Sequence, residues 1–365
     1  MAQQSGTGGG ARRPGRLGLF APFILLLVIA ALWSAGWVWL RGRAEREIDG
    51  WFAREARAGR TWTCADRRIG GYPFRLELRC AGLGFARRDV AFTVGPVVAV
   101  AQIYQPRHLI VEASGPFHVE QEGKVGDVTW RLLEGSLHLT EGGFQRVSVV
   151  ADGLDGRVSG VEPEPIAFAV NHLELHARPT PGRFEAEGAV DLSARVEKAA
   201  VPRLDSLLAS AEPADIVLDA TVTRAAGIRT RPLAEELERW RAAQGSVDLG
   251  RLSVEKGRGR LQAQGSLHLD EAHRPAGQFE VRTAGLDTVI APLVSDHLEG
   301  RIGGANAALI GKLVGQFLGG GRAREPAPEQ PAGAALKPLP PVRLVDGRVA
   351  VGPFALPNLR LDPLY

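Results

Sequence analysis

The chain has 365 residues and a mass of 39.0 kDa, and 45% of its residues are hydrophobic. This is enough to bury a core in one large domain or two ordinary ones, so disorder is excluded for most of the chain. Glycine is frequent, at 45 residues, while aromatic residues make up only 6%, a balance that favours turn-rich β-structure over a helical bundle.

The formal net charge of +3 is concentrated at the beginning of the chain. Nine arginines and four acidic residues up to Arg60 give that segment a charge of +5, and the remaining body carries −2. A near-neutral body offers no basic surface that tracks phosphates, so we expect no nucleic-acid partner.

Residues 17–40 form a run of 24 residues without a charge. At about 1.5 Å per residue, a helix of this length crosses a bilayer with some tilt. Trp33, Trp37 and Trp39 gather at its far end, where amphipathic rings favour the membrane interface. We therefore expect a cytoplasmic tail over residues 1–16 and a single-pass transmembrane helix, a signal anchor, over 17–40.

A cleaved signal peptide is the alternative interpretation of the same segment. Ser34 and Gly36 are small residues at suitable positions before a cleavage site. The apolar run is longer than the usual signal-peptide core of about 7 to 15 residues, which favours the uncleaved anchor.

The two cysteines, Cys64 and Cys80, suggest the side of the membrane on which the body lies. Arginines flank the apolar run on both sides, so the positive-inside rule does not orient it. Two cysteines separated by a hairpin-like stretch are best explained by a disulfide formed outside the cytosol, with two unpaired thiols as the alternative. We therefore expect an inner-membrane protein whose body lies in the periplasm of a Gram-negative cell.

Residues 41–60 continue the helical pattern and predict a juxtamembrane helix that ends at Gly59. After it the period changes to two. Residues 74–80 alternate apolar with charged side chains, so an extended strand places Cys80 and the apolar set on one face. Gly70, Gly71 and Pro73 predict the turn before it.

Short alternating segments then recur between glycine, proline and aspartate turns. They predict strands at 97–104, 108–113, 117–121, 128–132, 136–140, 144–151, 166–176, 184–196, 216–223, 246–255, 259–269 and 278–283. The connections are mostly too short for helical crossovers, so the sheet is antiparallel. We expect a mainly β protein, with a large curved antiparallel sheet in a β-rich domain over residues 61–318.

One phrase, Gly-Ser-Leu-His-Leu, occurs at 135–139 and again at 265–269. It is consistent with two tandem β-halves, although short β-motifs also recur by chance.

Two helices are expected to pack against this sheet. The first follows Pro232 and ends before Gly245. The second covers about 286–318 and carries Gly311, Gly315 and Gly319 at a spacing that resembles a membrane packing motif. Its apolar stretch is too short to span a bilayer, so packing on the sheet is favoured over dimerisation or a membrane-surface position.

The chain is rich in glycine, alanine and proline over 319–341, which predicts a flexible loop. Residues 342–365 then complete the domain with strands, because 342–351 alternates around Asp346-Gly347, a hairpin signal. Two prolines in the last residues suit an edge strand.

His172, Glu174 and His176 share one face of an expected strand and resemble a metal site of two histidines and a carboxylate. Alternate strand residues lie about 6.6 to 7 Å apart, too far to ligate one ion without bending the strand. We interpret the three as a solvated polar face and expect no metal or cofactor. The same surface interpretation holds for His138, His268 and His273.

Catalytic motifs are lacking from the sequence: there is no nucleophile elbow, phosphate-binding loop, zinc-protease motif or dinucleotide fingerprint. Gly257–Arg260 is a basic turn without a following helix, and Glu235 and Glu236 are placed on a helix face toward water. We therefore expect no catalytic residues and no enzyme.

The segment from Cys64 to Cys80, CADRRIGGYPFRLELRC, resembles the signature of an uncharacterised family of membrane-anchored periplasmic proteins, found chiefly in alphaproteobacteria. Gly71, Tyr72, Pro73 and Phe74 form its core, the signature turn. The ending around Asp346-Gly347 and Val351-Gly352-Pro353 is also similar, so the likeness covers the chain from about residue 60 onward. It implies an inner-membrane anchor and a β-rich envelope domain, and it supplies no catalytic residues.

A weaker likeness, in the phrases GSLHLD and GQFEVRTAGLD, is to the β-groove proteins of the AsmA type, which handle lipid between membranes. Two functions follow as hypotheses. In the first, the sheet forms an apolar trough that binds lipid. In the second, the protein is an envelope scaffold or assembly factor that binds a protein partner. A face of mixed bulky side chains favours the second, and a stripe of alanine and glycine favours the first.

Overall fold

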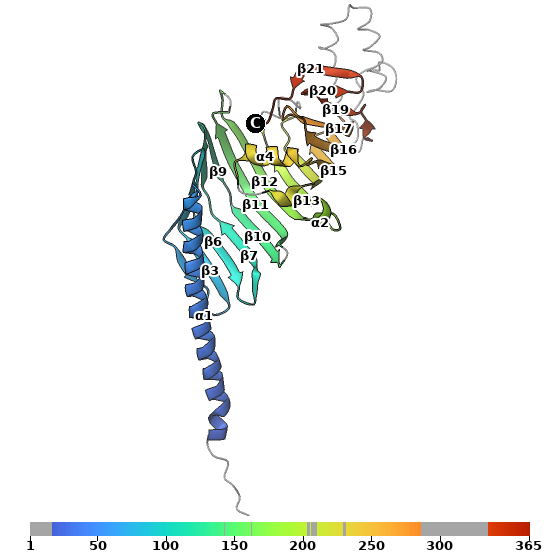
Figure 1. The fold of residues 1–365 in the computed structure, drawn as a ribbon. Coiled ribbons are helices and arrows are strands. Elements are labelled where there is room, and N and C mark those ends of the chain that lie inside the picture. Colours follow the sequence, from blue (N-terminus) through green and yellow to red (C-terminus); the bar gives the residue numbers. More distant parts are fainter. Residues whose placement is uncertain are drawn as a thin grey trace, which may run out of the picture.

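The computed structural model describes residues 17–141, 143–161, 163–202, 205, 210–228, 231–285 and 335–365. Figure 1 shows a long helix at one end of a single large sheet, with two short helices at the strand ends. The helices are α1 (Leu17–Arg57), α2 (Phe184–Glu187) and α4 (Leu233–Ala242), with a 3-10 turn η1 (Ala225–Gly227).

The strands belong to one antiparallel sheet. They are β1 (Thr61–Ala65), β2 (Arg68–Gly70), β3 (Arg75–Cys80), β4 (Gly82–Ala86), β5 (Val90–Val94), β6 (Val97–Gln102), β7 (Gln105–Ala113), β8 (Phe117–Gln121), β9 (Lys124–Thr129), β10 (Leu132–Thr140), β11 (Gly143–Ser159), β12 (Ile166–Pro179), β13 (Val190–Ala199), β14 (Ala214–Val222), β15 (Val247–Lys256), β16 (Gly259–Leu269), β17 (Pro275–Ala284), β18 (Lys337–Pro338), β19 (Val342–Val345), β20 (Arg348–Val351) and β21 (Phe354–Arg360). The expected mainly β, antiparallel fold class is therefore confirmed.

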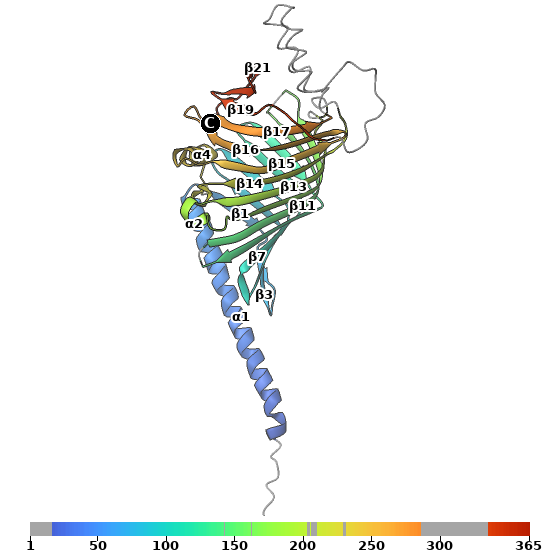
Figure 2. The ribbon, with the colours of Figure 1, turned by 90° about the vertical axis from the view of Figure 1, so that its right-hand side faces the viewer.

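Helix α1 joins the expected membrane segment and the juxtamembrane helix into one element. Its part from Phe20 to Arg57 is long and apolar enough to cross a membrane, and only 6% of its most apolar window is buried. The helix ends before Gly59, whose φ of 76° is left-handed backbone that glycine adopts without strain. Figure 2 shows that α1 extends well beyond the sheet.

The sheet divides at β11. The first half of this strand pairs with β10 and the second half with β9. From β10 one arm continues through β7, β6, β3 and β2, and from β9 the other continues through β8, β5, β4 and β1. We call these arm B and arm A. On its other side β11 pairs with β12, and the order then runs through β13 to β17.

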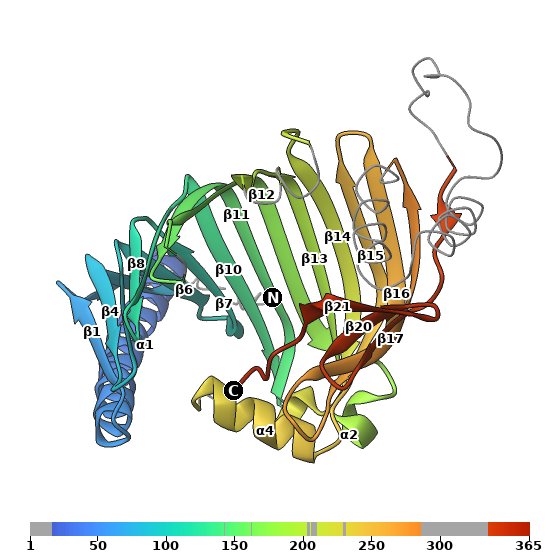
Figure 3. The ribbon, with the colours of Figure 1, turned by 90° about the horizontal axis from the view of Figure 1, so that it is seen from above.

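Seen from above, the sheet bends into an arch (Figure 3). Arm A stands at one end of the arch and β16 and β17 at the other, with α2, α4 and the C-terminus on the open side. The last strands extend the sheet, because β17 pairs with β18 near Thr283 and with β19 near Phe279. The chain then returns to α4, where the Tyr365 hydroxyl donates a hydrogen bond of 2.8 Å to Glu238.

The core of the N-terminal part lies between the two arms and α1. A disulfide joins Cys64 of arm A to Cys80 of arm B, with a Cα–Cα distance of 5.1 Å. Both cysteines share a face with the apolar residues of their arms, so the disulfide holds the two apolar faces toward one another. On arm A this face carries an aromatic series, Trp62, Phe85, Phe92 and Phe117, with neighbouring ring centroids 4.7, 5.1 and 5.6 Å apart.

Helix α1 closes this core, because the ring of Trp51 lies 5.4 Å from that of Trp62. On the outer face of β3, Glu77 is buried and forms ion pairs with Arg75 and Arg79. The buried carboxylate among the three charges that alternation placed on one face is therefore compensated by both arginines.

Several expected boundaries were wrong. Residues 184–187 form α2 rather than the start of a strand, because Gly188 adopts a left-handed conformation that closes a helical turn. The expected strand 128–132 is interrupted at 130–131, where the chain passes from arm A to arm B. Lys337–Pro338 pair with β17, so these two residues of the expected loop 319–341 form a strand, β18.

Other expectations agree with the structure or lie outside it. The first expected helix is α4, the hairpin at Asp346-Gly347 is β19–β20, and β8 and β16 have the expected bounds. Strands β1, β2, β4 and β5 were missed. The tail 1–16, the second expected helix and residues 319–334 lie outside the described residues.

The disulfide yields a stability prediction. Because it closes a loop between residues 16 apart, its loss costs about 3 kcal/mol of unfolding free energy. We expect the double variant Cys64→Ala/Cys80→Ala to show this loss in urea unfolding of the full chain in detergent micelles. A reducing agent should destabilise the wild type and leave the variant unchanged; equal unfolding midpoints for both proteins would contradict the prediction.

Candidate functional site

One face of the sheet is apolar over its whole width. Residues directly paired in an antiparallel sheet point to the same face, so the register lines up side chains in rows across the strands. A first row crosses from β3 to β19: Leu76, Ala101, Leu109, Leu137, Val147, Ala177, Leu192, Ala220, Leu249, Gly265, Phe279 and Val342. We call this surface the apolar face.

A second row runs beside the first from β3 to β17. Its members are Leu78, Ala99, Val111, Gly135, Val149, Leu175, Ala194, Leu218, Leu252, Ala263 and Val281. No member of either row carries a charge or a hydroxyl group. The alternating pattern of the sequence therefore builds one continuous hydrocarbon surface.

The apolar face is neither filled throughout by bulky side chains nor left open by small ones. Alanine or glycine neighbours leucine or phenylalanine along much of each row, as in Ala177–Leu192–Ala220–Leu249. At the centre of the sheet, Leu175 and Leu192 are 41% and 38% exposed. A side chain packed under a second layer would be far less exposed, so none of the described residues covers this part of the face.

The opposite face is polar and hollowed. A hollow of about 660 Å³ is lined by Ser148, His176, Ser193 and Asp219 from one row and by Arg178, Asp191, Thr221 and Asp248 from the next. Arg146 and Gly250 complete the rim, and four residues of the apolar face lie between the two rows. We call this the polar hollow. It mixes arginines, aspartates and hydroxyls, so it suits a polar partner rather than a hydrocarbon chain.

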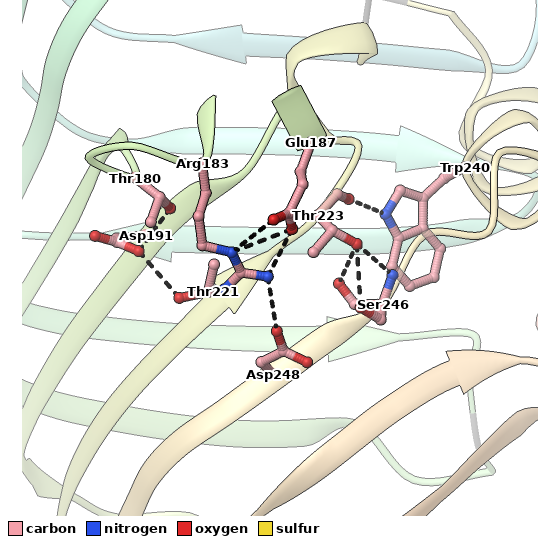
Figure 4. A network of polar contacts seen from close by, with 9 residues as sticks. All are labelled: Thr180, Arg183, Glu187, Asp191, Thr221, Thr223, Trp240, Ser246 and Asp248. Atoms are coloured by element: carbon pink, nitrogen blue, oxygen red, sulfur yellow. Dashed lines mark hydrogen bonds and ion pairs between the residues drawn. The ribbon is translucent and has the colours of Figure 1, made fainter. Parts of the chain in front are cut away.

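A network of polar contacts fixes the strand ends beside the polar hollow (Figure 4). Arg183 contacts Glu187 at 2.7 Å and Asp248 of β15 at 3.4 Å, which ties the α2 turn to the sheet. The hydrogen bond and charge of Glu187 raise the pKa of Arg183, and Arg183 in turn lowers the pKa of Glu187. These groups stay charged and hold the hollow in shape.

The same network anchors α4. The indole of Trp240 donates a hydrogen bond of 2.8 Å to the carbonyl of Thr223, and the Thr223 hydroxyl contacts Ser246 at 3.1 Å. Asp191 accepts hydrogen bonds from Thr180 at 2.7 Å and Thr221 at 3.0 Å. Thus α2 and α4 brace the ends of β12 to β15.

The signature turn lies against α1. The indole of Trp33 donates a hydrogen bond of 2.9 Å to the carbonyl of Pro73, and Ser34 Oγ lies 2.9 Å from the Tyr72 hydroxyl. The ring of Tyr72 meets Trp37 edge-on at 5.5 Å, and Phe74 lies 5.9 Å from Trp33. Gly71, with a φ of 98°, supplies the left-handed backbone that the turn requires.

The histidine and acidic candidates lie in hydrogen-bonded clusters on the surface. His172 Nδ1 lies 2.6 Å from Asp152 and its Nε2 lies 3.1 Å from Glu174, while His176 contacts Ser148 at 2.9 Å. Within the described residues, no group of three histidine, cysteine, aspartate or glutamate side chains is arranged to hold a metal ion.

The remaining candidates are dispersed. His138 stacks on His108 at 3.8 Å, His273 stacks on Tyr365 at 4.4 Å, and the His268 side chain is exposed in β16. Glu236 was wrongly placed toward water: it is buried, with ion pairs to Arg231 and Arg239.

The sequence did not indicate the polar hollow, nor the contact of the signature turn with α1. The hollow joins side chains from five strands, whose register depends on tertiary pairing. The contact has one signal in the sequence, the indoles of Trp33 and Trp37, whose N–H groups need acceptors.

The sequence profile of one bacterial family, described as an uncharacterised protein conserved in bacteria (DUF2125), matches residues 37–360. The match begins within α1 and ends with β21. No curated protein matches the chain.

The His172 cluster yields a pH prediction. Hydrogen bonds to Asp152, and then to Glu174, raise the pKa of His172 above its ordinary value of 6.5. The stabilisation is therefore complete below that value and is lost as the pH rises through the raised pKa. We expect the difference in unfolding free energy between wild type and His172→Asn to be largest below the ordinary pKa of 6.5 and to shrink as the pH rises through the raised pKa.

Chemical denaturation across this pH range measures the effect. In an Asp152→Asn background, the pH dependence of the His172→Asn effect should be smaller, because the main partner is neutral. A difference that is flat, or that grows with pH, would show that the cluster does not stabilise the imidazolium.

Proposed function

The chain belongs to the uncharacterised bacterial family DUF2125, and we propose that it is a membrane-anchored envelope protein that binds lipid acyl chains on its apolar face. The observation that carries the proposal is the first apolar row, which begins at Leu76 beside α1 and continues without a charge to β19.

The anchor is supported by the contacts of α1. Cleavage after Gly36 would remove Trp33 and Ser34, which bond to Pro73 and Tyr72 of the signature turn. The folded body therefore uses the segment that a signal peptidase would discard. The disulfide supports a body outside the cytosol, in the periplasm of a Gram-negative cell, because such bonds persist in oxidising compartments.

Lipid as the occupant is supported by the size and continuity of the face. Neighbouring strands lie about 4.8 Å apart, so a row from β3 to β19 measures about 50 Å along the sheet. This exceeds the hydrocarbon thickness of a bilayer, about 30 Å. The surface is long enough to shield whole acyl chains from water, and one end of it starts at the membrane helix. The phrases similar to AsmA-type proteins agree with this role.

We propose binding rather than catalysis. Many of the charged groups described above form structural ion pairs, as Arg183 does with Glu187 and Asp248, and the sequence carries no catalytic motif. A chain that shields a hydrocarbon needs no reactive group.

A second candidate function, an envelope scaffold or assembly factor, is favoured by the polar hollow. Its arginines, aspartates and hydroxyls can hydrogen-bond to an extended polypeptide, and α2 and α4 hold its rim rigid. The two candidate functions use opposite faces of the same strands. Adjacent residues of one strand point to opposite faces, so probes at two adjacent residues distinguish the two functions.

Site-specific photocrosslinking tests the proposal. We expect p-benzoylphenylalanine at Leu192, on the apolar face, to give a lipid adduct in membranes of cells labelled with ³²P-phosphate. The same residue at Ser193, which is adjacent in β13 but on the polar face, should give none. Phosphate-labelled adducts are detected on the full-length chain after gel separation.

The pair also tests the alternative. A protein adduct at Ser193 with no lipid adduct at Leu192 would replace the lipid proposal by the scaffold. A dimer adduct at Leu192 without lipid would assign the apolar face to a second copy of the chain.

A further inference from the structure

The last turns of the expected membrane span contact the body of the protein on one side, where Trp37 is buried. Trp33 and Trp37 lie seven and three residues before Leu40, the last residue of the uncharged run. At about 1.5 Å per residue, Trp33 is about 10 Å from the end of that run. The indole of Trp33 bonds to Pro73, and that of Trp37 donates to the carbonyl of Arg75 at 3.2 Å. The β2–β3 turn therefore lies at the level of the bilayer interface.

A second turn reaches the same level. The amide of Ile103, in the β6–β7 turn, donates a hydrogen bond of 3.0 Å to the carbonyl of Phe74. The aromatic side chains of both turns project outward, with Tyr72, Phe74 and Tyr104 exposed by 56%, 60% and 66%. Aromatic rings with this exposure are favoured at a membrane interface. The end of arm B thus rests on the bilayer.

An apolar cleft of about 450 Å³ lies between α1 and the β6–β7 turn. Its lining is Ile29, Leu32, Trp33, Gly36, Trp37 and Leu40 from the helix and Ile103 from the turn. The volume is in the range of ligand sites, about 300 to 1,000 Å³. Its helical wall belongs to the membrane-spanning run, so the molecules around it are lipids.

The cleft leads to the apolar face. Ile103 follows directly after β6, in which Ala101 pairs with Leu76 and Leu109. These residues begin the first apolar row. One hydrocarbon-lined path therefore connects the bilayer, the cleft and the sheet, with no charged side chain lining it between Ile29 and Leu192.

We propose that this cleft is the portal through which a phospholipid acyl chain passes from the bilayer to the apolar face. The inference rests on the proposed function and adds the route. The space beside Gly36 is open, because a Cβ atom at this position would meet no atom within 4 Å. A large side chain there can extend into the cleft without disturbing the backbone.

Two plugs from opposite walls test the portal. Gly36→Leu fills it from the helix and, since leucine favours a helix more than glycine does, preserves α1. Ile103→Trp fills it from the turn. Each plug has a matched control: Gly42→Leu, farther along α1, where a Cβ meets only Arg46 at 3.6 Å, and Tyr104→Trp, which is exposed.

The readout is the ³²P-lipid adduct formed by p-benzoylphenylalanine at Leu192 in the full-length protein. We expect both plugs to lower the adduct about tenfold by steric exclusion, and both controls to leave it unchanged. Far-UV circular dichroism and formation of the Cys64–Cys80 disulfide report whether the plugged proteins fold.

The outcomes separate the two proposals. If folded plugged proteins give as much adduct as the wild type, the portal is wrong and the binding function stands. If the wild type itself gives no lipid adduct at Leu192, the proposed function fails, and the portal fails with it. If only one of the two plugs lowers the adduct, the lipid does not pass between the helix and the turn, and the proposed portal is wrong.

Discussion

An antiparallel sheet with one hydrocarbon face must remove that face from water, and the rest of this structure follows from that requirement. Removing apolar surface from water is favourable by about 25 cal/mol per Å². Burial of an apolar face that spans many strands is therefore a large driving force for contact with other apolar groups. The arms, the long helix and the uncovered centre of the sheet meet this requirement in different ways.

The N-terminal part meets it within the chain. Arms A and B turn their apolar faces toward one another, and the disulfide between Cys64 and Cys80 holds the arms together. Trp51 of α1 packs against Trp62 and closes the core between the arms. Beyond β11 the sheet has one layer, and none of the described residues forms a second layer that faces it. Leu175 and Leu192 are therefore left exposed, on a surface that begins beside the apolar helix α1.

This division also explains what sequence could and could not predict. Strands β8 and β16 were predicted with their observed bounds, because a clear period of two ends at turn residues on both sides. Strand β2 has only three residues, too few for a period, and β4 contains Gly82 and Gly84, a residue type that is typical of turns. Strands β1 and β5 are as long as β8 and were missed all the same. The break at 130–131 reflects the passage between arms, a tertiary event that leaves no local pattern. The cysteine pair, the turn and the long N-terminal helix were predicted from sequence, but the contact between the turn and that helix was not.

The apolar face was the hardest feature to predict. Alternation told which residues of one strand share a face, whereas the rows depend on register between strands, and register depends on turns, bulges and pairing. Gly265 and Phe279, for example, meet in the first row only through the pairing of β16 with β17. The choice between a filled and an open face was also left undecided, since small and bulky residues alternate along the rows.

Lipid that stays bound to the full-length protein tests the central claim most directly. Lipid can be counted by mass spectrometry in the purified wild type and in Leu192→Glu and Ser193→Glu, which place the same charge on opposite faces of β13. A charge among acyl chains costs about 2 to 3 kcal/mol, so the account predicts at least about tenfold less face-bound lipid for Leu192→Glu. Ser193→Glu should match the wild type, and the lipid around α1 is common to all three. Equal lipid content in the two variants would contradict the account.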